Sequence, residues 1–255
     1  MIREVKNGVV YYRSTLLKSS HAFSTRFGGV STPSHLASMN LGRGRGDDEA
    51  ALEENYRIFL RQTSLPTALC SAEQIHSDRI VTVDQSYDFG APPPQCDGFV
   101  TKQTGITLAV KIADCLPILL EDPDAGVIGA VHAGWRGSVK GIVLQALGEM
   151  EKLGADVSRI RAVIGPRIGA CCFEVKQDFI EEYRKMMASD RFLVSRQGKT
   201  YCDLPMLNRE LLLGAGVLPC HFEDSELCTC CDPVQFFSHR ASGGKRGTMA
   251  AMIAL

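Results

Sequence analysis

The sequence places a thiol and an imidazole where the two groups could act together. Cys115 and His132 flank two apolar runs that are separated by the turn-rich segment 121–126. This pattern predicts a β-hairpin. If the turn centres on Pro123-Asp124, Cys115 and His132 are directly opposed on one face, with Cβ atoms about 4.5–5.5 Å apart. A slip of one residue in register would put them on opposite faces.

A second imidazole, His76, lies just before the strand-like segment 79–83. Catalytic zinc sites have three protein ligands and an open position, whereas structural sites are closed by four, and zinc takes Cys as thiolate and His as neutral imidazole. Without a metal, Cys115 and His132 instead suit a Cys-His hydrolase, with the thiol as nucleophile and the imidazole as its base. Spacing does not bring His76 to the hairpin, so both chemistries stay open.

The composition excludes several classes of protein. The chain has 255 residues, 45% of them hydrophobic and 22% charged, which is enough for a sizeable core in a globular protein. A net charge of −1 gives no field that would attract nucleic acid or an anionic membrane. No apolar run reaches the length of a membrane span, and the N-terminal sequence has no signal-peptide core. We therefore expect a cytoplasmic protein, monomeric or weakly homo-oligomeric, that binds neither nucleic acid nor membrane.

Strand-like and helical segments alternate without a break in composition, which predicts one α+β domain over residues 1–255 with mixed sheets. The expected helices are 48–61, capped by Asp47 or Asp48, then 138–153, 177–187 and 203–213. The expected strands are 79–83, 105–111, 160–164 and the two arms of the central hairpin. A closing hairpin is expected from 236–239 and 249–254, about the Gly-rich turn 242–244.

Ten cysteines without a secretion signal are expected to be reduced, and most to pack as small hydrophobic residues. We expect the pair Cys171-Cys172 to pack under the loop that precedes it. The segment 220–231 holds four cysteines and a histidine, and Cys228-x-x-Cys231 has metal-ligand spacing, but no second Cys-x-x-Cys closes a site. A non-enzymatic alternative is that these C-terminal cysteines sense redox state or buffer metal.

Six segments carry a resemblance to a known family: AEQIHSDRI, IADCLPILL, AVHAGWRGSVKGI, IGPRIGACCFEV, FSTRFGGVS and FFSHR. Together they make the sequence resemble, over about residues 23–246, the YfiH/YlmD-type family, formerly labelled laccase-domain or polyphenol oxidase. The resemblance implies a purine nucleoside phosphorylase and adenosine deaminase of the FAMIN type, in a four-layer α/β/β/α fold. It implies His76, Cys115 and His132 as metal ligands. The implied substrates are adenosine, inosine, guanosine and S-methyl-5'-thioadenosine, with phosphate.

The older laccase label conflicts with the small number of histidines that could serve as copper ligands. A multicopper oxidase needs a trinuclear copper centre built from many imidazoles, but this chain has six His and no His-x-His pair. A single copper could replace zinc in vitro, because copper(II) outranks zinc on such ligands. Single-copper polyphenol oxidase activity therefore stays open as an alternative.

The resemblance also points to residues around the expected metal site. Arg26 lies in a Gly-containing loop and suits an anionic substrate such as phosphate. Trp135 and Arg136 open a helix whose free N–H groups suit an oxyanion. Asn40 matches a family motif, but the chemistry of its side chain indicates no specific role. Asp114 is expected to act as a proton relay or as the hydrogen-bond partner of a ligand His. The ordinary alternatives are a turn for Arg26 and Asp114 and the core for Trp135.

Two reaction schemes follow from these residues. An open-site zinc lowers the pKa of its water to about 7, which supplies a hydroxide for attack on the purine ring of adenosine. For phosphorolysis, we expect zinc, Arg26 and Arg136 to orient phosphate toward the anomeric carbon of the ribose. In the metal-free alternative, Cys115 and His132 form an amidase that acts on a cell-wall precursor or another amide.

Overall fold

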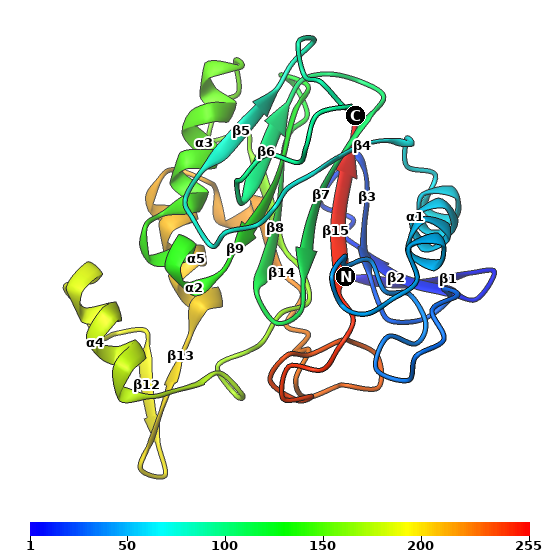
Figure 1. The fold of residues 1–255 in the computed structure, drawn as a ribbon. Coiled ribbons are helices and arrows are strands. Elements are labelled where there is room, and N and C mark those ends of the chain that lie inside the picture. The colour runs from blue at the N-terminus through cyan, green and yellow to red at the C-terminus, as the bar shows by residue number, and fades with distance from the viewer.

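The computed structural model describes residues 1–255, and two six-stranded sheets form its centre (Figure 1). The first sheet, in spatial order, contains β1 (Ile2–Lys6), β2 (Val9–Arg13), β3 (Ser20–Ser24), β15 (Met249–Ala254), β7 (Ile106–Ile112) and β4 (Ala68–Ser71). The second contains β14 (Phe222–Asp224), β10 (Arg161–Ile164), β8 (Leu116–Asp122), β9 (Val127–Ala133), β6 (Gly98–Thr101) and β5 (Ile80–Val83). Both sheets mix parallel and antiparallel neighbours, as the α+β expectation requires.

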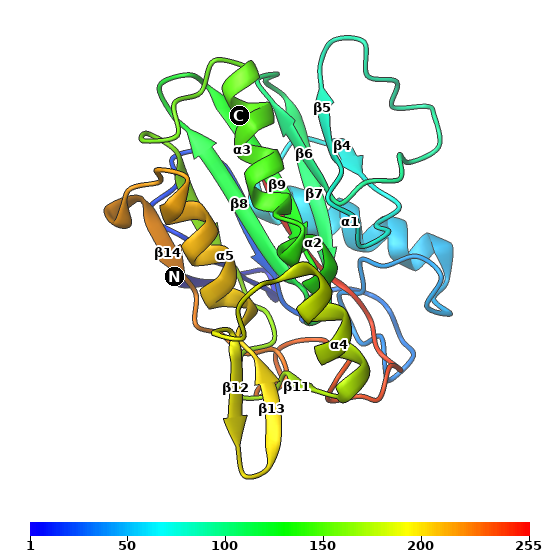
Figure 2. The ribbon, with the colours of Figure 1, turned by 90° about the vertical axis from the view of Figure 1, so that its left-hand side faces the viewer.

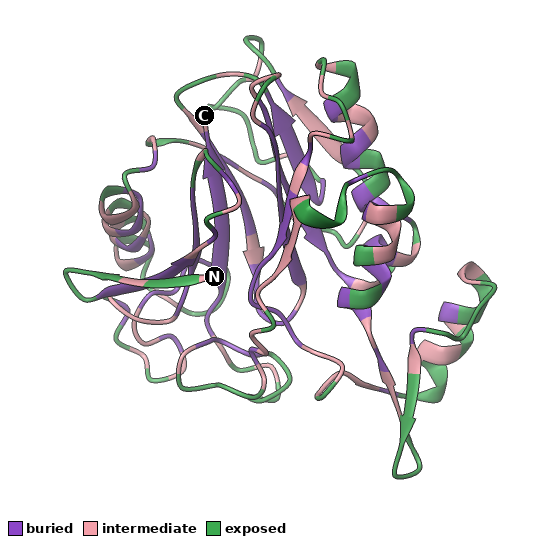
Figure 3. Ribbon diagram, turned by 180° about the vertical axis from the view of Figure 1, so that it is seen from behind, coloured by how far each residue is buried: buried purple, intermediate pink, exposed green.

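Three hydrophobic clusters pack against the faces of these sheets. A cluster of 20 buried residues contains side chains of both sheets, such as Phe23 of the first and Leu119 of the second. A cluster of 23 packs the second sheet against α3 (Ile142–Lys152) and α5 (Leu204–Gly214). A cluster of 12 packs the first sheet against α1 (Glu49–Thr63). The central strands β8, β9 and β15 are accordingly buried along their whole length, whereas the edge strand β1 is largely exposed (Figure 3).

The expected helices form close to their expected positions. Asp48 caps α1 by accepting the N–H of Ala50, and Asp203 caps α5 by accepting the N–H of Met206. The third expected helix is α4 (Gln177–Met186). The helix expected over 138–153 is divided into α2 (Trp135–Val139) and α3, because Gly141 between them has φ +76°. None of the helices is long and apolar enough to cross a membrane.

The central hairpin is confirmed, but its register differs from the one expected. Pro117, not Cys115, pairs with His132, so the turn lies one residue later in the sequence. The reason is Asp122, which belongs to β8 and whose carboxylate accepts two N–H groups of the turn, from Asp124 and Ala125. An offset of two residues preserves the faces of the strands, so Cys115 stays diagonal to His132 on the same side.

The expected closing hairpin is wrong. Residues 236–239 form no strand, and β15 instead lies inside the first sheet between β3 and β7. Phe236 and Phe237 are apolar because they anchor a loop in the cluster shared by the two sheets, where each is 1% exposed. An apolar run can therefore reflect the burial of a loop rather than a strand.

A small third sheet projects from the body, as Figures 1 and 2 show. It contains β11 (Glu174–Val175), β13 (Lys199–Cys202) and β12 (Leu193–Arg196), with α4 beside it. A short 3₁₀ turn (Pro219–His221) leads into β14. The loops that precede β11 and follow β14 both approach the site described next.

Candidate active site

The fold brings His76, Cys115 and His132 together. Their ligand atoms all lie within 4.8 Å of one another, and Cys115 Sγ is 3.9 Å from His76 Nε2. The two imidazole rings are 5.0 Å apart and nearly perpendicular. His132 comes from β9 and Cys115 from the turn before β8, whereas His76 comes from the loop after β4 in the other sheet. The tertiary structure thus brings together three side chains whose proximity could not be predicted from their spacing in the sequence.

Asp97, a residue that the sequence analysis missed, holds both histidines. It lies directly before β6 and is fully buried. Its carboxylate accepts Nδ1–H of His132 at 2.9 Å, which leaves Nε2 of that ring for a metal or a proton. The same carboxylate accepts the N–H groups of Ile75, His76 and Ser77 at 2.6–3.3 Å. The only feature of the sequence that could have indicated this role of Asp97 is its position as an acidic residue immediately before an apolar strand.

Two features bring His76 close to the other ligands. His76 has φ +58°, in the left-handed region that residues other than Gly adopt only when their surroundings hold them. Gly134 provides the space for its ring, because a Cβ at that position would lie 2.9 Å from Cδ2 of His76. The carboxylate of Asp97 therefore holds the backbone of His76, and the missing side chain of Gly134 makes room for its imidazole.

The electrostatics of the group favour a thiolate. Burial by itself raises the pKa of Cys115, but the imidazoles of His132 and His76 outweigh burial and lower it to about 6. Burial lowers the pKa of His132, but the Cys115 thiolate and the Asp97 carboxylate raise it to about 9. The thiolate is both the metal-binding and the nucleophilic form of Cys.

The donor set fits a zinc ion with an open position. One sulfur and two imidazole nitrogens converge, and no fourth Cys, His, Asp or Glu joins them. Asp114, the nearest carboxylate in the sequence, accepts Thr229 Oγ1 at 2.6 Å and the N–H of Arg240 at 2.7 Å. The carboxylate that is hydrogen-bonded to a ligand His is therefore that of Asp97. Asp114, which was expected to fill this role as one alternative, does not fill it.

Two cavities meet at His76 and Cys115, and His132 lines the smaller of them. Both include His76, Cys115, Arg45 and Arg246 in their walls. The smaller cavity, about 490 Å³, is lined by four cations: Arg43, Arg45, Lys111 and Arg246. Nε of Arg246 is buried and has no partner, although Nη1 is bonded to Thr248, so one donor of this guanidinium remains unsatisfied. Burial lowers the pKa of Arg246 to about 10, which leaves it a cation at neutral pH.

The larger cavity, about 760 Å³, has apolar and aromatic side chains in its wall: Ile75, Trp135, Ile168, Phe173 and Leu204. Four arginines also line it: Arg45, Arg136, Arg240 and Arg246. The ring of Trp135 packs 4.5 Å from the ring of Phe179 and is only partly buried. Arg136 lies 4.3 Å over Trp135 and forms an ion pair with Glu182 at 2.9 Å. Trp135, Arg136 and Asp114 thus all line this cavity, in agreement with their expected neighbourhood.

Arg26 and Asn40 lie outside both cavities. The guanidinium of Arg26 donates to the carbonyl groups of Ala37 and Pro233 at 3.0 and 2.9 Å and stacks on Phe237. Asn40 is fully buried and joins distant loops, because its Oδ1 accepts the N–H of Thr248 at 2.9 Å. Both residues organise the loops behind the cavities, and their contact with substrate stays a prediction.

The chain belongs to the family described as multi-copper polyphenol oxidoreductase laccase, whose sequence model matches residues 20–255. A protein named purine nucleoside phosphorylase from Deinococcus radiodurans is 35% identical over 97% of this chain and 94% of its own length. A protein named adenosine deaminase RL5, from an unknown prokaryote, is 34% identical over 89% of this chain and 90% of its own length. The crystal structure of YlmD from Geobacillus stearothermophilus superposes with a TM-score of 0.89 at 32% identity, covering 98% of this chain and 97% of that chain.

These comparisons confirm the resemblance to the YfiH/YlmD-type proteins. The copper in the family's description does not match the donor set found here. Only two imidazoles meet at any group of possible metal ligands, so no trinuclear copper centre can be assembled from this chain. The site therefore either binds one metal ion or acts without a metal.

Proposed function

We propose that this protein is a zinc-dependent purine nucleoside enzyme that cleaves nucleosides with phosphate and deaminates adenosine. The observation that carries the proposal is the position of the three-ligand centre between two cavities that both have cationic side chains in their walls, of which the larger also has aromatic ones. Phosphate requires the cationic side chains and a purine base the aromatic ones. The names of the relatives, phosphorylase and deaminase, support the same two reactions.

Phosphate fits the cationic cavity. Arg45 and Arg246 line both cavities, so an anion held between them lies beside His76 and Cys115. The unpaired buried Nε–H of Arg246 is a donor for a phosphate oxygen. Lys111 adds a cation at the same wall, and its ammonium is held by the carbonyl of Ala72 at 2.7 Å. Together these residues orient phosphate toward the anomeric carbon.

The purine fits the aromatic cavity. Trp135 and Phe173 offer flat apolar surfaces, and the carboxylate of Asp114 lies on the same wall. A zinc ion held by His76, Cys115 and His132 supplies a Lewis acid with one open position beside the bound nucleoside. Asp114 is the candidate for moving a proton to or from the base, because it lines the cavity and its carboxylate is not hydrogen-bonded to the side chain of any of the three ligands.

Two further expectations belong to this proposal. The order of the clusters, with helices against the outer face of each sheet, supports the four-layer α/β/β/α arrangement. The substrates we propose are those that the resemblance implies, adenosine, inosine, guanosine and S-methyl-5'-thioadenosine, because all four share a purine base that suits the aromatic side chains of the larger cavity.

The test is to incubate the zinc-loaded protein with adenosine, with and without phosphate. We expect adenine only when phosphate is present and inosine in both cases. The variant Arg246→Gln should raise the KM for phosphate at least about tenfold and leave inosine formation nearly unchanged, as the loss of a charged hydrogen bond implies. The exposed Cys220→Ser variant is the control. If neither adenine nor inosine forms, the proposal is wrong.

A metal-free Cys-His hydrolase is the second candidate, because the order Cys115, His132, Asp97 is that of a nucleophile, its base and the group that orients the base. Iodoacetamide distinguishes the two. A free thiolate at Cys115 reacts quickly at neutral pH, whereas a zinc-bound one is protected until a chelator is added. Fast labelling that zinc does not slow would favour the hydrolase.

A further inference from the structure

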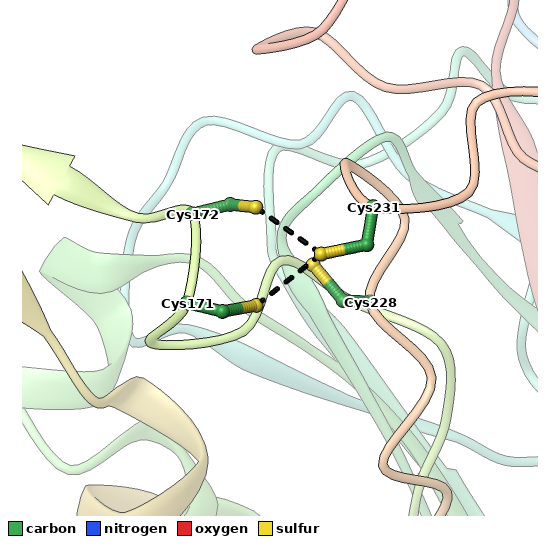
Figure 4. Close-up of side chains that lie close together, drawn as sticks. All are labelled: Cys171, Cys172, Cys228 and Cys231. Atoms are coloured by element: carbon green, nitrogen blue, oxygen red, sulfur yellow. Dashed lines mark hydrogen bonds between the residues drawn. The ribbon is translucent and has the colours of Figure 1, made fainter.

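Four cysteines from two distant segments converge on the surface near the active site. Cys171 and Cys172 lie in the loop before β11, and Cys228 and Cys231 in the loop after β14. Figure 4 shows the two pairs of side chains pointing toward one another across the gap between the loops. All four sulfurs lie within 4.8 Å of one another. The expectation that Cys171-Cys172 packs under the preceding loop is therefore wrong, because these two side chains meet the second cysteine pair instead.

The sulfur spacing is that of ligands to one ion. Cys231 Sγ lies 3.3 Å from Cys172 Sγ and 3.5 Å from Cys171 Sγ. A disulfide requires about 2.05 Å, whereas the edge of a tetrahedron with Zn–S bonds of about 2.3 Å is about 3.8 Å. The spacing of Cys228-x-x-Cys231 is the usual one for two zinc ligands on one loop. Cys171-Cys172 completes the set that the sequence lacked.

The backbone around the cysteines is arranged to support thiolates. The N–H of Gly169 points at Cys228 Sγ at 3.3 Å. The two loops are joined by the N–H of Arg167 to the carbonyl of Leu227 at 3.1 Å and by the N–H of Thr229 to the carbonyl of Arg167 at 2.9 Å. Gly169 also leaves the space open, since a Cβ there would lie 3.2 Å from Cys171 Sγ. The loops therefore present the cysteines in a fixed geometry before any ion binds.

We propose that Cys171, Cys172, Cys228 and Cys231 form a second, structural zinc site that is closed by four sulfur ligands. Four thiolates without any oxygen ligand select a soft ion, and a complete tetrahedral shell leaves no position for a substrate. Cys230, which lies between two of the ligands, takes no part. His221 is directed elsewhere, with Nδ1 bonded to the carbonyl of Ser158 at 3.0 Å.

The site fixes a wall of the larger active-site cavity. Asp114 has φ +92° and is held by three contacts, all from the two cysteine loops and the segment that follows them. The N–H of Ile168 donates to its carbonyl at 2.8 Å, Thr229 Oγ1 to its carboxylate at 2.6 Å, and the N–H of Arg240 to the other oxygen at 2.7 Å. An ion that joins the loops thus holds Asp114 and positions the neighbouring Cys115, without touching substrate.

Metal analysis of the protein purified without chelator tests the proposal. We expect about two zinc ions per chain in the wild type. The variants Cys172→Ser and Cys231→Ser should each retain about one and should lower Tm by about 5 °C or more. The matched control Cys230→Ser, in the same loop, should retain both ions and the wild-type Tm. Because the wild type binds at two places, Cys115→Ser should also retain about one ion.

Cobalt(II) substitution identifies the ligands independently of activity. In the Cys115→Ser variant, bound cobalt should give the intense sulfur-to-metal charge transfer of a tetrathiolate, and Cys231→Ser should abolish it. One zinc per chain in the wild type, with none left in Cys115→Ser, would overturn the proposal and leave the proposed function intact. Iron at the four cysteines, or disulfides among them in the purified protein, would also overturn it.

Discussion

The two sulfur-containing centres of this molecule differ in what surrounds them more than in their distance from the surface. The centre of His76, Cys115 and His132 mixes one sulfur with two imidazoles and opens onto two cavities. The cluster of Cys171, Cys172, Cys228 and Cys231 has four identical ligand atoms, and neither cavity includes any of them. The comparison teaches that ligand number and neighbouring space, rather than the presence of cysteine, separate a reactive site from a structural one.

The supports of the two centres differ as well. A buried carboxylate, Asp97, orients the imidazole of His132 and holds the backbone of His76 in the first centre, whereas the backbone N–H of Gly169 faces the sulfur of Cys228 in the second. A carboxylate makes an imidazole a stronger ligand and fixes its tautomer. Backbone N–H groups stabilise thiolate charge without adding a titratable group. Three substitutions separate these two designs, and a pH experiment on His21, outside both centres, measures an acid sensitivity that does not depend on either.

The largest effect is expected from Cys115→Ser. Loss of the thiolate should reduce nucleoside turnover more than about 100-fold, because removing a ligand should cost more than removing its hydrogen-bond partner. Steady-state assays of adenine and inosine, together with metal analysis, provide the measurement. Cys96→Ser is the control, since Cys96 is buried in the core and belongs to neither centre. Retained turnover in Cys115→Ser would remove this residue from the reaction.

Asp97→Asn should come next. An amide at this position can accept from His132 Nδ1 but turns its NH₂ group toward some of the N–H groups of residues 75–77. We expect about a 10–100-fold loss of metal affinity at the first centre, which competition with a zinc indicator measures. The four-cysteine cluster should keep its ion. An unchanged affinity would show that Asp97 has only a structural role.

Thr229→Val tests the link between the two centres. Thr229 lies between Cys228 and Cys231, and its hydroxyl donates to Asp114. We expect a drop of about fivefold in turnover, equivalent to one hydrogen bond of about 1 kcal/mol, with the zinc content unchanged. Thr229→Ser keeps the hydroxyl and should restore the rate. If valine at this position matches the wild type, the two centres are independent.

The smallest effect concerns His21, which belongs to neither centre. Burial lowers its pKa, and its Nε2 accepts the N–H of Ser14 at 2.9 Å, so only the neutral ring fits. The facing charged groups are Glu121, Glu223 and Arg13. As the pH falls, His21 therefore binds a proton at a higher pH in the unfolded chain than in the folded one. His21 leaves the free energy of unfolding unchanged above pH about 6.5 and reduces it as the pH falls further. Urea unfolding between pH 7 and 5 checks this.

His21→Gln keeps an acceptor for the N–H of Ser14 and should flatten that pH dependence. The measurement is made on zinc-free protein, so that release of metal does not contribute to the slope. An equal slope in wild type and variant would mean that other groups cause the loss of stability in acid. The comparison then isolates how much of the acid sensitivity of the loaded protein comes from its metal ligands.

Several elements were predictable because their causes are local. The cap at Asp48, the cap at Asp203 and the turn between β8 and β9 each depend on residues within a few positions of one another. The closing hairpin failed because Phe236 and Phe237 are buried by residues far away in the sequence. Strands β3 and β4 were missed because β3 pairs with the last strand, β15, and β4 with β7. Strands β1 and β2 were missed although they form a local hairpin about Asn7-Gly8, a turn signal that the sequence analysis did not use.

The sequence by itself determined the donor types: three possible zinc ligands near strand ends, an excess of cysteine, and too few imidazoles for a multicopper centre. Only the tertiary structure decided which donors meet. It carried His76 across from the other sheet, put the carboxylate of Asp97 behind two histidines, and joined Cys171-Cys172 to a loop more than fifty residues away. The physical reason is that ligand chemistry belongs to single residues, whereas convergence depends on the packing of two sheets whose shared buried cluster joins strands that are distant in the sequence.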